Sequence, residues 1–222
     1  MIGTNEKAFL DAVDPPAFRL LGVALRPFSL GHFILLSHLG NRFVVGDGAP
    51  NLLDLIQGAF VCSRPFAQAQ AAVRGPVFRK WLRRCLVHLW GRQCLVRIGF
   101  LPLYSVSVPR MVQTFSDYVA AHCHGPEVAP NDARHMDRPQ PGTPFLQFVR
   151  VTLMARLNYS RTEVMDVPWC EALHDVFAYW ELDGRTHLVS DRDRDLWEAH
   201  KAALEKLSGQ LDEIERQYGL RQ

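Results

Sequence analysis

The feature that most constrains the fold is a long segment without acidic residues. Between Leu55 and Ser116 the chain has no Asp or Glu, but it has nine Arg or Lys residues. Within this segment, residues 77–90 (VFRKWLRRCLVHLW) place apolar pairs every four residues, with mainly cationic residues between them. This repeat, with one apolar and one cationic face, predicts an amphipathic helix. We expect the helix to cover 77–90 and to end at Gly91.

Length and composition indicate a folded globular protein. Of the 222 residues, 48% are hydrophobic and 22% are charged, which is ordinary for a globular chain and too apolar for a disordered one. A chain of this length can bury a core as one large or two small domains. No apolar run approaches the roughly 18–20 residues that cross a bilayer, and the N-terminal sequence lacks the apolar core of a signal peptide. We therefore expect a cytoplasmic chain without a transmembrane segment.

The cysteines do not suggest a disulfide framework. They are odd in number, have no CxxC spacing, and three of them lie in or beside predicted helices with apolar neighbours. Such cysteines are typical of reduced, buried thiols in a reducing compartment. The five are Cys62, Cys85, Cys94, Cys123 and Cys170.

Capping and turn residues divide the first half of the chain into helices. Ser29 is a good N-cap for a helix that stops at Gly40, and Asn51 can cap a helix over residues 52–62. Residues 43–45 (FVV) are expected to be extended. Residues 1–16 are expected to form a short helix or an arm, and further helices are expected over 66–75 and 109–121. Residues 95–108 alternate in a way that could form a strand, which their glycine and prolines disfavour.

The second half shows the same signals. Ser160 and Glu163 form a capping-box pattern, and Pro168 suits the first turn of a helix that runs to about Trp180. Ser190 can cap a last helix, charged along most of its length, whose apolar positions form a narrow seam. Another helix is expected over residues 145–157, with Phe148, Val151, Leu153 and Met154 facing the core.

These elements predict an all-α or mainly α fold. We expect a compact helical body and a long charged C-terminal helix, with at most a minor strand pair. Residues 1–121 would form the body, including the acid-free segment, and residues 145–222 a C-terminal helical unit. Between them, residues 122–144 contain five prolines and are expected to be a loop or linker.

The cationic face of the 77–90 helix has several possible partners. Nucleic acid, an anionic membrane, an acidic protein, or simple solvation of a surface helix all fit such a face. The whole chain carries a net charge of only +2 and has no nucleic-acid-binding motif, which disfavours nucleic acid. An acidic partner fits better, or the acidic stretch 181–222 of the same chain, which has ten acids and seven bases.

Eight residues are therefore predicted to contact a protein partner. Trp and Arg are common anchors of protein interfaces, although core packing explains the tryptophans equally well. Six of the residues are in the 77–90 helix and two are in the seam of the last helix. They are Arg79, Lys80, Trp81, Arg83, Arg84, Trp90, Leu204 and Leu211.

Signs of catalysis or metal binding are weak. The candidates for a zinc site are His122, Cys123, His124 and His135. Zinc ligands are usually paired two to four residues apart, however, and the three adjacent residues of HCH are too close together to bind one ion easily. We expect a polar loop, with no metal and no cofactor.

Three acidic residues are the remaining candidates for catalysis. Asp166, Glu171 and Asp175 lie close in sequence, but such carboxylates more often form a solvated helix face than a site. The chain also has no P-loop, GxGxxG, GxSxG or HExxH motif. We therefore expect a protein that is not an enzyme.

Two parts of the chain resemble a known kind of protein. One is residues 18–46 (FRLLGVALRPFSLGHFILLSHLGNRFVVG) with residues 54–66 (DLIQGAFVCSRPF), and the other is residues 157–184 (LNYSRTEVMDVPWCEALHDVFAYWELDG). In their pattern of apolar and turn residues they are similar to small helical proteins encoded among phage tail genes, of the tail assembly chaperone-like kind. The similarity covers about half of the chain, and the remainder of the acid-free segment, residues 67–116, lies outside it.

The resemblance implies a non-enzymatic function. Such chaperones bind the tape-measure protein, keep its long apolar helices soluble and assist tail assembly in the host cytoplasm. The alternatives are a structural tail or neck component that stays in the virion, or a nucleic-acid- or membrane-associated module that uses the 77–90 helix. Self-association is compatible with each of these.

Overall fold

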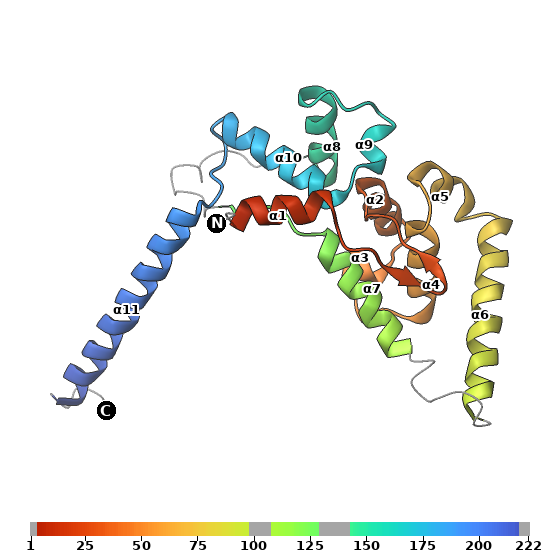
Figure 1. Ribbon diagram of the computed structural model, residues 1–222, viewed down its shortest axis with the longest axis horizontal. Coiled ribbons are helices and arrows are strands. Elements are labelled where there is room, and N and C mark those ends of the chain that lie inside the picture. The colour runs from red at the N-terminus through yellow and green to blue at the C-terminus, as the bar shows by residue number, and fades with distance from the viewer. Residues whose placement is uncertain (1–3, 98–107, 129–142, 218–222) are drawn as a thin grey trace.

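The computed structural model describes residues 4–97, 108–128 and 143–217, except for the side chains at 4, 92–97 and 212–217. Within these ranges it contains eleven helices and one small two-stranded sheet, which confirms the mainly α prediction (Figure 1). The elements are α1 (Thr4–Val13), β1 (Arg19–Leu20), β2 (Val23–Ala24), α2 (Leu30–His38), α3 (Arg42–Val45), α4 (Leu52–Cys62), α5 (Phe66–Ala72), α6 (Pro76–Arg97), α7 (Val108–His122), α8 (Phe145–Arg156), α9 (Glu163–Asp166), α10 (Trp169–Leu182) and α11 (Asp191–Gln217).

The predicted helix caps are present. The Ser29 hydroxyl accepts the His32 N–H at the start of α2, and the Asn51 side chain accepts two N–H groups at the start of α4. Ser160 and Glu163 form the expected reciprocal pair, at 3.0 and 3.2 Å. Ser190 accepts the Asp193 N–H at 3.2 Å and so caps α11. Each cap satisfies a backbone N–H group that a helix leaves unpaired at its first turn.

Three local predictions are wrong. Residues 43–45 belong to the short helix α3, because Asn41 caps it and Gly46, at φ +73°, ends it. The amphipathic helix does not end at Gly91: α6 continues to Arg97, since one glycine weakens a helix by only about 1 kcal/mol. The strand predicted over 95–108 is therefore helical at its start, and residues 98–107 lie outside the described part.

The strand pair forms earlier in the chain than expected. β1 and β2 pair antiparallel, with Leu20 opposite Val23, so Leu21 and Gly22 make a two-residue turn. Both turn residues have positive φ, +50° and +80°. This is the conformation of a type I′ turn, whose twist matches that of the strands it joins.

One hydrophobic core joins the two halves of the chain. It includes Phe28, Phe60 and Tyr118 from the predicted body and Leu153 and Trp169 from the predicted C-terminal unit. The backbones also meet, since the Trp169 N–H donates to the Phe28 carbonyl at 2.7 Å. Not every predicted core residue is buried, because α8 turns Val149 and Leu153 inward and leaves Val151 52% exposed.

Close approach between α2 and α9 depends on a glycine. A Cβ atom at Gly31 would lie 2.4 Å from the Met165 carbonyl oxygen and 2.6 Å from the Phe66 ring. Both distances are far inside van der Waals contact, so only glycine fits there. The contact fixes the segment around Asp166 against the start of α5.

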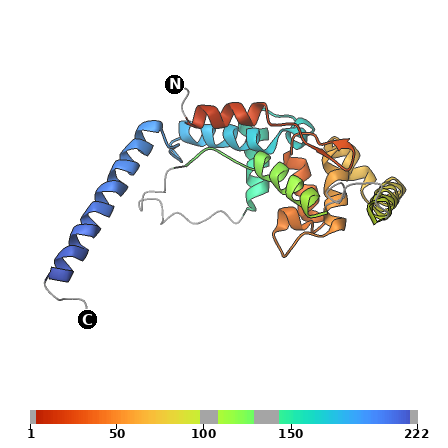
Figure 2. The ribbon, with the colours of Figure 1, turned by 60° about the horizontal axis from the view of Figure 1, so that its bottom comes forward.

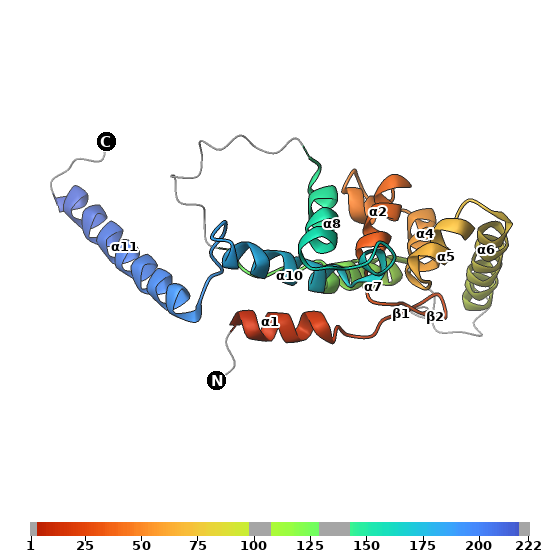
Figure 3. The same cartoon turned by 90° about the horizontal axis from the view of Figure 1, so that it is seen from above.

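The two amphipathic helices lie at opposite ends of the molecule. Figures 1 and 3 show α6 beyond α4 and α5 at one end and α11 at the other. Figure 2 shows α11 extending away from the body, whereas α1 lies along α10 within it. Among the described residues, no helix is both long and apolar enough to span a membrane.

Candidate functional site

The inner face of α6 attaches the helix to the core. The Phe78 ring lies 5.1 Å from the Phe60 ring, and the Trp81 ring lies 6.0 Å from it. The Trp81 indole N–H also donates to the Ile56 carbonyl, at 3.4 Å. Trp81, which the sequence placed among the partner-binding residues, is therefore largely a packing residue.

The outer face of α6 is cationic and exposed. The side chains of Arg79, Lys80, Arg83 and Arg84 are exposed, and none forms a hydrogen bond or an ion pair within the described part of the chain. Trp90 is 71% exposed. The structure thus places five of the six predicted α6 residues on a surface that a partner can reach.

The seam of α11 is also exposed. Trp197, Leu204 and Leu211 are spaced seven residues apart, with Leu207 between the last two, and all four are between 42% and 60% exposed. The start of the helix contacts the body, where Arg194 pairs with Glu127, and Figure 2 shows the described helix extending away from the body beyond that point. Both predicted seam residues, Leu204 and Leu211, therefore lie on an apolar stripe that faces solvent.

The cationic face of α6 is not covered by the acidic end of the same chain. Because α6 and α11 lie at opposite ends (Figure 3), the suggested intrachain neutralisation by residues 181–222 is absent from the described structure. Within the described residues, no acidic group pairs with this face.

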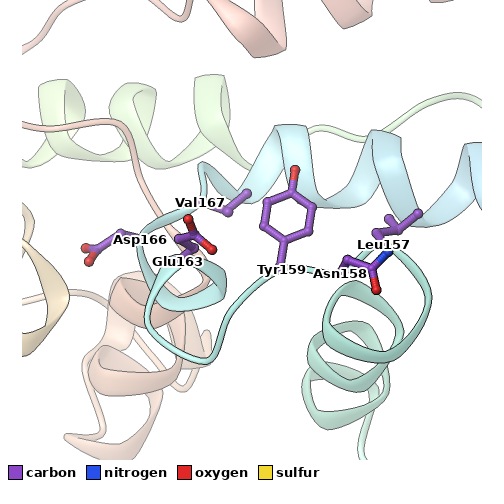
Figure 4. A pocket seen from close by; sticks show the side chains of 6 residues that line it. All are labelled: Leu157, Asn158, Tyr159, Glu163, Asp166 and Val167. Carbon is purple, nitrogen blue, oxygen red and sulfur yellow. The ribbon is translucent and has the colours of Figure 1, made fainter.

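Another hollow lies beside Tyr159 (Figure 4). It has a volume of about 490 Å³ and is lined by Leu157, Asn158, Tyr159, Glu163, Asp166 and Val167. A second hollow of about 370 Å³ shares Leu157 and Tyr159 and reaches Asp175 on α10. Figure 4 shows the Tyr159 ring between the end of α8 and α9, with its hydroxyl directed toward α10.

The carboxylates around Tyr159 already have structural partners. Asp166 accepts the Phe66 N–H at 2.8 Å and so caps α5, whose own N-cap residue is a proline. Glu163 is occupied by Ser160, as described above. Asp175 accepts the Tyr159 hydroxyl at 2.8 Å. Of the three acidic residues considered for catalysis, Asp166 thus caps α5, a role that Glu171 and Asp175 do not share.

The electrostatics of Tyr159 do not favour acid–base catalysis. Burial, together with the hydrogen bond to Asp175, raises the pKa of Tyr159, so its hydroxyl stays protonated near neutral pH. Burial and the neighbouring Asp175 also raise the pKa of Glu171. This arrangement orders the connection from α8 to α10, and we assign it a structural role.

The predicted histidine cluster is divided by the fold. The His122 ring is buried and bonds the Tyr118 carbonyl at 2.7 Å, whereas the His124 ring faces the His174 ring at 6.3 Å. Burial raises the pKa of the Cys123 thiol to about 12. His135 lies outside the described residues, and within them no three His, Cys, Asp or Glu side chains could hold a metal ion.

One site was not predicted from the sequence. A pocket of about 390 Å³ lies between the β1–β2 turn and α6, lined by Leu21, Gly22, Trp81, Arg84, Cys85 and His88. Its two walls are about 60 residues apart in sequence, so no local spacing could indicate it. The available signal was Gly22, because glycine readily adopts the left-handed conformation that a two-residue hairpin turn requires.

Comparison with known proteins found no match among family models, curated proteins or solved structures.

Proposed function

We propose that this protein is a non-enzymatic helical binding protein that assists phage tail assembly in the host cytoplasm. Its client would be a long tail protein with apolar helices, such as the tape-measure protein. The exposed seam of α11 is the observation that supports the binding role. The apolar and turn pattern shared with tail assembly chaperone-like proteins supports the connection to the phage tail.

The seam has the dimensions needed to hold a helix. α11 has 27 residues, which corresponds to about 40 Å of α-helix. A stripe with the spacing of Trp197, Leu204, Leu207 and Leu211 is the narrow kind that pairs with another helix in a coiled coil. Left uncovered, these side chains remain in water, and a client helix would remove that apolar surface from solvent.

Charged residues beside the seam fit a carrier. Glu198, Lys201 and Glu205 are all exposed on α11. Both signs of charge are present, so these residues can keep a complex soluble without strong attraction to either sign. The client would therefore be selected mainly by its apolar stripe.

Co-expression tests this proposal. The chain is expressed with the proposed client, a tape-measure protein from the same genome, and we measure the soluble, co-purifying fraction of that protein. Leu204→Lys with Leu211→Lys should reduce this fraction at least tenfold. The matched control, Ala199→Lys with Ala202→Lys, adds the same charge on the other side of α11 and should change it less than twofold.

Two results would overturn the proposal. The first is a tape-measure protein that stays insoluble, or fails to co-purify, with the unaltered chain. The second is an equal loss of binding in the seam and control variants. If the chain is also found in purified virions, it acts as a structural tail or neck component and not as a transient chaperone.

A further inference from the structure

The pocket between the β1–β2 turn and α6 has a strained wall. Leu21, at φ +50°, is one of only two described non-glycine residues with positive φ. A left-handed conformation is unfavourable for a leucine, because its Cβ comes too close to the following carbonyl oxygen, and Gly, Asn or Asp normally occupy such turns. Leucine offers what those residues lack, an apolar side chain at the pocket. Strain of this kind often accompanies a binding function.

The floor of the pocket is rigid. Trp81 is held by its hydrogen bond to Ile56 and by its contact with the Phe60 ring. Cys85 beside it is buried, at 6% exposure. A site whose walls are fixed before binding loses less conformational entropy when a ligand enters.

The edge of the pocket is positive and lacks a counter-charge. Arg84 and His88 line it, are exposed, and have no hydrogen-bond or ion-pair partner among the described side chains. All six lining residues come from two parts of the chain, 15–46 and 55–116, and neither part contains any Asp or Glu. A potential of this sign attracts an anionic ligand to an apolar opening.

We propose that this pocket binds one bulky apolar side chain of a partner protein, in a segment whose flanking residues are acidic. The volume of about 390 Å³ is at the small end of the roughly 300–1,000 Å³ range of ligand sites, which suits a single anchoring side chain. The inference rests on the proposed function, because it specifies a second contact with a protein client. The site lies at the opposite end of the molecule from α11 (Figure 1).

A peptide fits this site better than a membrane. Binding to a bilayer surface needs a broad apolar face that enters the lipid, but the apolar side chains of this pocket are recessed between a turn and a helix. One anchoring residue with carboxylates beside it satisfies both the apolar floor and the cationic edge. Interfaces commonly place a single buried anchor at such a point.

Fluorescence anisotropy with labelled peptides tests the inference. The probe is EDEFEDE, with EDEAEDE to remove the apolar anchor and KRKFKRK to reverse the charge. We expect EDEFEDE to bind the full-length chain at least tenfold more tightly than either comparison peptide. Equal binding of EDEFEDE and EDEAEDE would overturn the proposal, as would equal or tighter binding to anionic phosphatidylglycerol vesicles.

Variants then locate the binding. Arg84→Glu with His88→Glu should weaken EDEFEDE binding at least tenfold. Arg79→Glu with Arg83→Glu removes at least as much positive charge from the other side of α6 and should weaken it less than threefold. An equal loss of EDEFEDE binding in the two variants would show that the positive charge of α6 attracts the peptide in general. It would contradict binding at the pocket.

A third variant tests the strained wall without risking the fold. Leu21→Gly removes the apolar wall and relieves the left-handed strain, so binding should fall while the midpoint of urea unfolding does not decrease. Unchanged EDEFEDE binding would exclude a role for Leu21 and overturn the proposed anchor pocket. If no acidic peptide binds but the tape-measure protein still co-purifies through α11, this inference fails and the proposed function stands.

Discussion

At the scale of single residues, buried histidines make the fold sensitive to acid. His32 is buried; its Nδ1 accepts the Ser29 N–H at 3.2 Å, and its Nε2 is 2.8 Å from the Arg64 carbonyl oxygen. This pattern requires a neutral ring with its proton on Nε2. Burial lowers the pKa of His32, so protonation of the folded protein breaks the cap of α2.

The lowered pKa gives a prediction for stability. The unfolded chain takes up a proton at a pKa of about 6.5, before folded His32 does, so the stabilisation is present above that pH and is lost as the pH falls. The cost is at most about 1.4 kcal/mol per pH unit between the two pKa values. Burial also lowers the pKa of His122 and His174, and both add to the same slope.

Urea unfolding at pH 7.5, 6.0 and 5.0 measures this effect. His32→Gln retains a side chain that can complete the capping box, and it should show a smaller loss of unfolding free energy on acidification than the unaltered chain. The exposed His200, replaced by Gln, serves as the control. Equal slopes in all three proteins would mean that His32 is not responsible.

At the scale of elements, the starts of helices were predicted correctly, whereas one helix end and the contacts between elements were not. Ser29, Asn51 and Ser190 predicted helix starts, because a cap depends on residues within one turn. The end of α6 was predicted wrongly, because a glycine is a weak stop when it is inside a helix. The inward position of Trp81 could not be predicted, since its partners Ile56 and Phe60 belong to another helix.

The exposed face of α6 should tolerate reversal of its charge. Replacing Arg79, Lys80, Arg83 and Arg84 by Glu breaks no hydrogen bond or ion pair within the described chain, and we expect the unfolding free energy to change by less than about 1 kcal/mol. Trp81→Ala removes core contacts and should cost about 3 kcal/mol. Urea denaturation compares the two. Unfolding of the fourfold variant would show that this face is packed against α11 or a second copy.

At the scale of the whole molecule, the core and the two exposed surfaces are separate. The mainly α fold class could be predicted, because apolar periodicity and caps indicate buried helices. The pocket beneath Leu21 was not, because a leucine in a left-handed turn contradicts the usual preference and its partners are distant in sequence. The division at residues 122–144 stays a prediction, although side chains from both sides of it share one core.

This separation predicts that α11 is dispensable for folding. The core cluster ends with α10, and the segment that follows is held by Val189, which is buried and whose N–H donates to the Glu127 carbonyl at 2.9 Å. A chain that stops at Ser190 retains that bond and loses the Arg194–Glu127 pair, a partly exposed contact worth at most about 1 kcal/mol. Its melting temperature should therefore fall by no more than about 4 °C.

The same truncation should abolish solubilisation of the tape-measure protein while leaving EDEFEDE binding at α6 unchanged. A chain that stops at Pro168 is the control: it loses Trp169, Leu173 and Val176 from the core and should not fold. Circular dichroism follows folding, and co-purification and anisotropy follow the two surfaces. If the chain ending at Ser190 unfolds, α11 packs on the body in solution and its seam is not free for a client. If that chain folds and still solubilises the client, the binding surface lies elsewhere, and α6 with its cationic face becomes the first place to search.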